Sequence, residues 1–161
     1  MSKQEKRFSD LEHIPDELKT LPTWVCYRME ERFGQTTPTK VPYNPVTGEK
    51  AKANDPSTWT DYETCVAAVK RSDYAGIGFE FAPPFVGVDL DHCRDAVTGV
   101  IEDWAQEIIT HLDSYTEASP SGTGIHIIIR GSLPPGRRRQ GPVEMYDSGR
   151  FFTMTGDQVS R

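Results

Sequence analysis

Two aspartates separated by one residue, Asp89 and Asp91, are the side chains of this chain best suited to hold a metal ion. A strand alternates its faces, so in the run 85–91 both carboxylates project from one side and the aliphatic residues from the other. Carboxylate oxygens are the ligands that Mg²⁺ and Mn²⁺ prefer. The pair therefore predicts a metal site of the kind used in phosphoryl transfer. The alternative is a strand end that enters an Asp-rich turn.

Two later segments show the same alternation. In 125–130, three isoleucines share one face and leave His126 on the other, and in 143–146 Glu144 lies opposite two apolar residues. If these strands are neighbours of 85–91, the three carboxylates and the imidazole cluster on an open sheet face, while helices cover its back. This set suits two-metal nucleotidyl transfer, in which His126 with Arg150 would neutralise phosphate charge.

Other polar residues are candidates for phosphate contacts. The small-residue loop 119–124, with the hydroxyls of Ser119, Ser121 and Thr123, can cradle phosphate oxygens with backbone N–H groups. Lys40 lies in a turn-rich stretch, and we interpret it either as a phosphate contact or as a surface lysine. A Pro/Gly loop carries three consecutive arginines, which either contact nucleic-acid phosphates or form a solvated loop: Arg137, Arg138 and Arg139.

The composition limits the class of protein. The 161 residues are 36% hydrophobic and 26% charged, with 13 glycines and 12 prolines, which suits one loop-rich domain with both helices and strands. The net charge of −6 does not favour nucleic-acid binding, although local charge matters more than the sum. No apolar run approaches the roughly 20 residues that span a membrane, so we expect a cytoplasmic protein without a membrane partner.

The three cysteines are few and far apart in the sequence. Cys26, Cys65 and Cys93 are odd in number, which argues against a disulfide framework and predicts reduced, structural thiols. Cys93 follows His92 directly after the paired aspartates, so a zinc site is an alternative for this segment. No second Cys/His pair at ligand spacing supports it.

The periodicity also predicts the elements that must position the site. We expect a single domain over 1–161, with a poorly ordered start at 1–13, an N-terminal lobe at about 14–75 and the sheet with the carboxylates at about 76–157. The clearest helix covers 101–112, where apolar residues recur at helical spacing. A second helix follows capping residues at 54–58. The strand at 75–81 is expected to turn at Pro83-Pro84 into a hairpin with 85–91.

Three segments together resemble the motifs of the archaeo-eukaryotic primase superfamily. They occur in the same order as in that superfamily: 86–91 (Val-Gly-Val-Asp-Leu-Asp), 119–126 (Ser-Pro-Ser-Gly-Thr-Gly-Ile-His), and 143–146 with 150–156. More narrowly, the chain is similar from about Trp24 to Gly156 to the primase-polymerase domains of phage and plasmid replication proteins. The superfamily often has Ser-x-His in its second motif, whereas Gly124 stands two residues before His126 here.

The resemblance implies an α+β fold, with an RNA-recognition-motif-like (RRM-like) antiparallel catalytic sheet backed by helices and a small N-terminal α/β lobe. It implies that Asp89, Asp91 and Glu144 are metal ligands and that His126 contacts the phosphates of the incoming nucleotide. The implied activity is DNA primase and polymerase: template-directed nucleotidyl transfer with Mg²⁺ or Mn²⁺. The implied partners are a DNA template and primer, NTPs or dNTPs, and a helicase or other replication domain, fused or in trans.

Two other functions are compatible with the same residues. One is a non-catalytic nucleic-acid-binding replication module on the same fold. The other is a metal-dependent nuclease that uses the same carboxylates.

Overall fold

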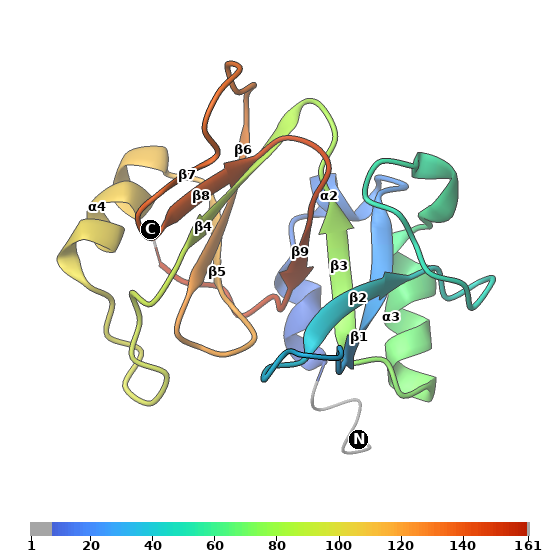
Figure 1. The fold of residues 1–161 in the computed structure, drawn as a ribbon. Helices are drawn as coiled ribbons and strands as arrows, with labels where there is room; N and C mark the ends of the chain where they lie inside the picture. The colour runs from blue at the N-terminus through green and yellow to red at the C-terminus, as the bar shows by residue number, and fades with distance from the viewer. Residues whose placement is uncertain (1–7, 161) are drawn as a thin grey trace.

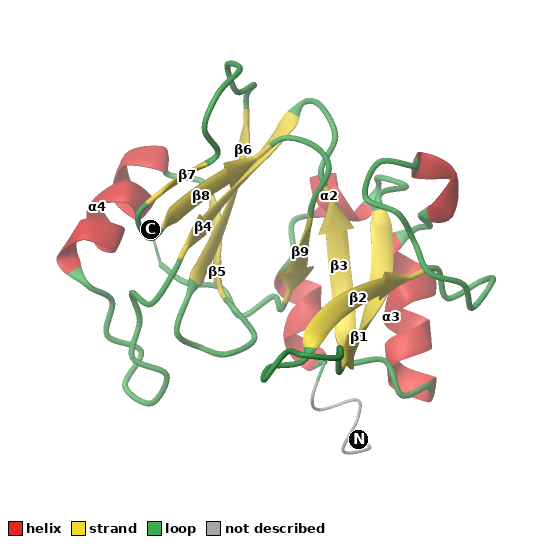
Figure 2. Ribbon diagram, viewed as in Figure 1, coloured by secondary structure: helices red, strands yellow, loops and turns green. Residues whose placement is uncertain are grey.

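The structure, a computed structural model, describes residues 8–160. It is an α+β fold with two antiparallel sheets that lie side by side (Figures 1 and 2). The helical elements are η1 (Ser9–His13), α2 (Asp16–Lys19), η2 (Pro56–Thr58), α3 (Tyr62–Arg71) and α4 (Asp103–Leu112). The strands are β1 (Trp24–Glu30), β2 (Thr39–Tyr43), β3 (Gly76–Glu80), β4 (Phe85–Leu90), β5 (Tyr115–Ala118), β6 (Ile125–Arg130), β7 (Arg139–Gln140), β8 (Val143–Tyr146) and β9 (Phe151–Met154).

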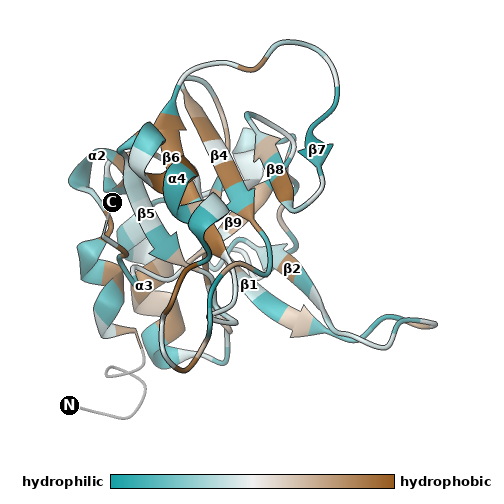
Figure 3. Ribbon diagram, turned by 90° about the vertical axis from the view of Figure 1, so that its left-hand side faces the viewer, coloured by the Kyte–Doolittle hydropathy of each residue, from teal (hydrophilic) through white to brown (hydrophobic). Residues whose placement is uncertain are grey.

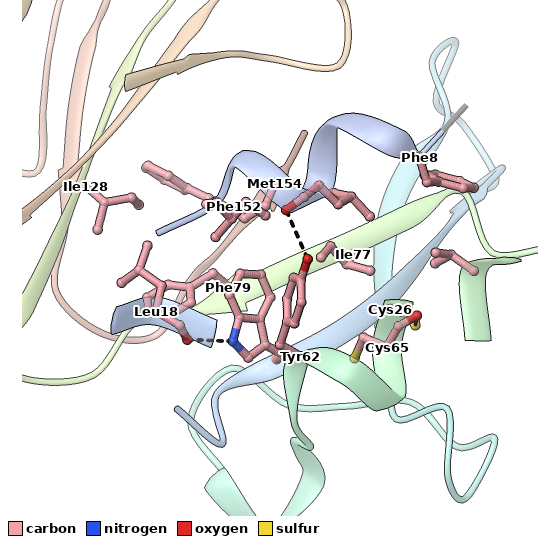
Figure 4. Packing of buried hydrophobic residues seen from close by; sticks show 14 of the residues in the cluster. Phe8, Leu18, Cys26, Tyr62, Cys65, Ile77, Phe79, Ile128, Phe152 and Met154 are labelled. Atoms are coloured by element: carbon pink, nitrogen blue, oxygen red, sulfur yellow. Dashed lines mark hydrogen bonds between the residues drawn. The ribbon is translucent and has the colours of Figure 1, made fainter. Parts of the chain in front are cut away.

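The first sheet has the strand order β2-β1-β3-β9, and the short N-terminal helices and α3 pack on one of its faces. Aromatic residues dominate this core. The indole of Trp24 donates to the carbonyl of Leu18 (2.9 Å), and the hydroxyl of Tyr62 donates to the carbonyl of Leu11 (2.9 Å), as Figure 4 shows. Buried donors of this kind need a partner, so these two bonds fix the helices over the sheet.

The second sheet has the order β5-β6-β4-β8-β7, and α4 covers one face of it (Figure 3). The expected apolar stripe of α4 is buried against aliphatic residues of β4 and β6, including Val88 and Ile127. This face is the one predicted from strand alternation. The opposite face of β4, which carries Asp89, is therefore left for polar side chains.

The predicted hairpin of 75–81 with 85–91 is wrong. β3 pairs with β1 and β9 in the first sheet, whereas β4 pairs with β6 and β8 in the second. The segment between them crosses from one sheet to the other, and the buried rings of Phe81 and Phe85 lie in the core that both sheets share. Alternation identifies a strand but not its partner, and both strands are apolar enough to be central.

The expected grouping of the strands also needs correction. We placed 76–157 in the sheet with the carboxylates, but β3 and β9 belong to the first sheet. The start at 1–13 was expected to be poorly ordered, yet Ser9–His13 form a turn of 3₁₀ helix, and Phe8 and Leu11 are buried in the first core. Residues 1–7 of that prediction lie outside the described residues.

Two further points concern the helices. The side chain of Asp61 caps α3 by accepting from the backbone N–H of Thr64 (2.8 Å). The capping residues expected at 54–58 lie earlier, and Asp55 among them caps η2. Within the described residues, no helix is both long and apolar enough to cross a membrane.

Candidate metal and nucleotide site

The strand neighbours of β4 bring the predicted site together. β6 lies on one side of β4 and β8 on the other, and Asp89 is directly opposite His126 in the first pair and Glu144 in the second. Directly opposite residues in antiparallel strands point to the same face. The structure thus places these three side chains on one sheet face, as alternation predicted. Asp91 follows the last residue of β4 and completes the group.

Three carboxylates converge at this point. One oxygen from each of Asp89, Asp91 and Glu144 lies within 4.8 Å of the other two, and Glu144 is buried while the two aspartates are half-buried. We call these three residues the carboxylate triad. Hard oxygen donors this close together match the ligands of Mg²⁺ or Mn²⁺, so the residues present fit a divalent metal.

The electrostatics of Asp89 agree with a cation site. Burial, together with the neighbouring charges of Asp91 and Glu144, raises the pKa of Asp89 to about 7. Lys40 and Arg150 oppose this shift with their positive charges. Within the triad, Asp91 and Glu144 thus disfavour the charged form of Asp89, and a bound cation would relieve that repulsion.

His126 is buried on the same face and is held from two sides. Its Nδ1 lies 3.0 Å from the carbonyl of Thr153, and its ring stacks on Phe152 with centroids 4.7 Å apart. Burial lowers the pKa of His126 to about 4, so the ring is neutral at pH 7. Nδ1 must then carry the proton, because a carbonyl can only accept. The unprotonated Nε2 lies 3.7 Å from the carboxylate of Asp89.

A cleft of about 630 Å³ opens over this face, between the two sheets. Asp89, His126 and Tyr146 line it from the second sheet, and Lys40 lines it from β2 of the first. Arg150 also lines it, with its guanidinium 3.6 Å from Glu144 and over the ring of Tyr146 (4.6 Å). The cleft thus combines the carboxylate of Asp89 at one wall with two cationic side chains at its edge. Desolvation lowers the pKa of Lys40.

Two residues contact the triad that we had not assigned to it. The hydroxyl of Tyr146 donates to the carboxylate of Glu144. The guanidinium of Arg139 lies 2.7 Å from Glu144 and 3.5 Å from Asp91. Alternation had put Tyr146 on the face of Glu144, so the signal for it was present. The position of Arg139 depends on the two-residue strand β7, which the sequence pattern does not reveal.

The predicted phosphate loop lies beside the triad but outside the cleft. The hydroxyls of Ser119, Ser121 and Thr123 bond to one another in sequence, at 3.1 and 2.8 Å, and the Ser119 hydroxyl accepts from the N–H of Gly124 (3.0 Å). The carbonyl of Thr123 accepts from the N–H of Cys93. The three hydroxyls do not line the cleft. Their role as nucleotide contacts stays a prediction.

The three consecutive arginines have different surroundings. Arg137 is exposed. Arg138 donates to the carbonyl of Pro134 (2.7 Å) and lies 4.0 Å from Asp147, while Arg139 contacts the triad. All three nevertheless line one pocket, together with Val143 and Met145. Binding of nucleic acid by these arginines stays a prediction.

The zinc alternative at 89–93 is not supported. The thiol of Cys93 is buried and donates to the carbonyl of Leu90 at 3.4 Å. Among residues 8–160, the one group with metal-ligand geometry is the carboxylate triad, which includes neither His92 nor Cys93. All three cysteines are free and buried, as expected for structural thiols.

Comparison with known proteins adds one relative. The chain is 37% identical over 142 residues to the DNA primase-polymerase of Nitratiruptor phage NrS-1, an alignment that covers 83% of this chain. It covers only 19% of the relative, so the chain spans about a fifth of that protein's length. No family model matches the chain. The identity confirms the resemblance to phage primase-polymerases.

Proposed function

From this relationship to a phage primase-polymerase, we propose that the chain is the catalytic domain of a DNA primase and polymerase. The reaction is metal-dependent transfer of a nucleotidyl group from an NTP or dNTP to a 3′-hydroxyl, directed by a DNA template. The observation that carries the proposal is the carboxylate triad at the adjacent strands β4 and β8, beside a cleft that Asp89 lines and whose edge holds two cationic side chains. Phosphoryl transfer requires this combination of metal ligands and phosphate contacts.

Each residue of the site has a proposed role. Asp89, Asp91 and Glu144 hold the divalent ions, and two ions rather than one is the finer form of the proposal. When bound, Mg²⁺ or Mn²⁺ would stabilise charge on the phosphates and activate the attacking hydroxyl. The side chains of Lys40 and Arg150 contact the triphosphate and supply the positive charge that neutral His126 lacks.

The neutral ring of His126 has a different proposed role. With Nδ1–H donated to Thr153, Nε2 is a fixed acceptor beside Asp89. It can accept a hydrogen bond from a hydroxyl or water at the triphosphate and so orient the nucleotide. The stacking on Phe152 keeps the ring in this orientation.

The finer statements about fold and partners are also proposals. We propose that the second sheet corresponds to the RRM-like catalytic sheet of the superfamily, with α4 on its back, and the first sheet to the N-terminal lobe. Ser119, Ser121 and Thr123 would approach the nucleotide, and Arg137, Arg138 and Arg139 the nucleic acid. Further replication domains such as a helicase would act with this chain, fused or in trans.

A primer-extension assay tests the function. The wild-type chain would be incubated with a primed DNA template, dNTPs or NTPs, and Mg²⁺ or Mn²⁺, and compared with Asp89→Asn, Asp91→Asn and Glu144→Gln. We expect extension by the wild type and a loss of at least about 100-fold in each variant, because removal of a metal ligand removes charge stabilisation of the transition state. Circular dichroism would show that the variants fold.

The same assay separates the other two functions. Metal-independent DNA binding without extension would favour the non-catalytic module. Shortening of the labelled strand in Mn²⁺ without nucleotides would favour the nuclease. Extension that is unchanged in all three variants would overturn the proposed site.

A further inference from the structure

We infer that the hairpin between β1 and β2 is a contact surface for single-stranded DNA, with Phe33 at its tip stacking on a base. This inference rests on the proposed function, because it takes the DNA template as the ligand. The hairpin loop, residues 31–38, stands out from the body of the molecule (Figure 3). Neither the carboxylate triad nor the two cores involve the residues of this loop.

The hairpin tip is an ordered turn and not a loose loop. The backbone N–H of Gln35 donates to the carbonyl of Arg32 (3.0 Å), and Gly34 has φ +80°, which is the geometry of a type II turn with Phe33 at its second position. The side chain of Gln35 accepts from the hydroxyl of Thr39 at the start of β2 (2.9 Å). The turn therefore holds Phe33 in a fixed outward position.

The ring of Phe33 makes no contribution to the core. It is fully exposed, so it lacks the stabilisation that a phenylalanine normally gains from burial. An aromatic ring presented in this way can stack on the face of any base, since every base has a π-face. The exposed ring of Phe33 is therefore suited to stack on single-stranded DNA without sequence preference.

The strands below the tip connect it with the cleft. Met29 of β1 is half-exposed and lies directly opposite Lys40 of β2, so the two side chains share a face. Pro38, Thr39 and Lys40 all line the cleft with Asp89. One surface therefore leads from the carboxylates past Lys40 and Met29 to the tip.

The charge of this segment fits a polyanion. Residues 31–40, the hairpin loop and the start of β2, contain two basic side chains, Arg32 and Lys40, and one acidic side chain, Glu31, although the whole chain has a net charge of −6. At the base of the hairpin, the carboxylate of Glu30 accepts from the hydroxyl of Tyr43, and Glu31 is exposed. A basic surface with an aromatic residue is the usual combination for binding single strands.

The test is binding of a fluorescein-labelled single-stranded oligonucleotide, measured by anisotropy without nucleotides. The variants are Phe33→Ala, Phe33→Leu and Phe33→Trp. The control is Val97→Ala, which removes another almost fully exposed apolar side chain, on the loop before α4. We expect affinity at least about fivefold weaker for Phe33→Ala and Phe33→Leu, and affinity equal to the wild type for Phe33→Trp and Val97→Ala.

A spectroscopic reading supports the stacking itself. The extra emission of the Phe33→Trp variant, relative to the wild type, should be quenched when the oligonucleotide is added. Equal binding by the wild type and Phe33→Ala, full binding by Phe33→Leu, or no binding by the wild type would each overturn the inference. So would a change of oligomeric mass in Phe33→Ala without a change in DNA binding, because the ring would then serve contact between copies of the chain.

The two proposals fail in different ways. DNA binding that depends on Phe33, without nucleotide transfer under any condition, would keep this surface and refute the proposed activity. Extension that depends on Asp89 but not on Phe33, with binding unchanged in Phe33→Ala, would do the reverse.

Discussion

The guanidinium of Arg139 lies 2.7 Å from the carboxylate of Glu144 and so places a fixed positive charge beside the three proposed metal ligands. Its other nitrogen is 3.5 Å from Asp91, so the same side chain bridges two members of the triad. A metal ion and this guanidinium would bind the same carboxylate oxygens of Glu144 and Asp91. The arginine is therefore a competitor of the metal as well as a neighbour of the site.

Replacing Arg139 should strengthen metal binding. In Arg139→Ala the triad loses a neutralising charge, and we expect Mn²⁺ to bind about fivefold more tightly, which corresponds to about 1 kcal/mol for a half-exposed ion pair. Titration calorimetry at low ionic strength would measure it. Arg137→Ala is the matched control, since it removes an exposed charge from the same loop. Equal tightening in both variants would point to overall charge and not to this contact.

Removing the hydroxyl of Tyr146 should leave the carboxylate of Glu144 less well oriented and so weaken metal binding. The Tyr146→Phe variant keeps the ring on which the guanidinium of Arg150 lies, but loses the hydrogen bond to the carboxylate. A hydrogen bond to a charged group stabilises by about 1.5 to 3 kcal/mol. We expect the Mn²⁺ concentration for half-maximal extension to rise several-fold. A variant that loses nucleotide affinity instead, at saturating metal, would place the hydroxyl in the nucleotide contact.

Buried Glu80 should make the stability depend on pH. Its side chain is fully buried, neither oxygen has a hydrogen-bond partner among the described residues, and burial raises its pKa to about 7. Between its ordinary pKa near 4.5 and pH 7 the folded state binds the proton more tightly than the unfolded state. Stability contributed by the protonated form is therefore present at low pH and is lost as the pH rises through 7.

The Glu80→Gln variant isolates this effect. At pH 8 it should be more stable than the wild type by about 1 to 3 kcal/mol, and this difference should disappear near pH 4.5. Urea unfolding at a series of pH values would measure it. A difference that does not change with pH would mean that the pKa of Glu80 is the same in the folded and unfolded states, which would contradict the effect of burial.

A methyl group at Gly87 should destabilise the core and displace the ring that supports His126. A Cβ at this position of β4 would overlap the rings of Phe81 and Phe152, and Phe152 is the ring on which His126 stacks. We expect Gly87→Ala to lower the free energy of unfolding by about 1 to 3 kcal/mol, as for other overpacked cores. Urea unfolding would measure it. Adding Phe81→Leu should restore part of the loss, whereas simple additivity would contradict the steric explanation.

The site was largely predictable from the sequence. In each of three short strands, the alternation of apolar and polar residues places one candidate side chain on the polar face: Asp89, His126 and Glu144. The pairing of β6, β4 and β8 then places these residues opposite one another. This alternation of faces depends only on local backbone geometry, so the sequence alone predicts which side chains share a face. The roles of these residues and of Lys40, Arg150 and the Ser/Thr loop remain proposals.

The partners of the strands were not predictable in the same way. Phe152 reaches His126 because β9 joins the first sheet, and Arg139 reaches Glu144 because of a two-residue strand. Both depend on contacts between segments that are far apart in the chain. Local periodicity contains no information on such contacts, and the wrong hairpin of β3 with β4 has the same cause.

The position of β9 has a consequence for how the chain is made. β3 is paired on one edge by β1, but its other edge is paired by Phe151–Met154, which follow every strand of the second sheet in the sequence. On a ribosome, which extends a chain from its N-terminus, the first sheet stays open at that edge until the second sheet has been synthesised. The two sheets therefore finish folding together, and a nascent chain that stops before β9 leaves an unpaired edge available to other chains.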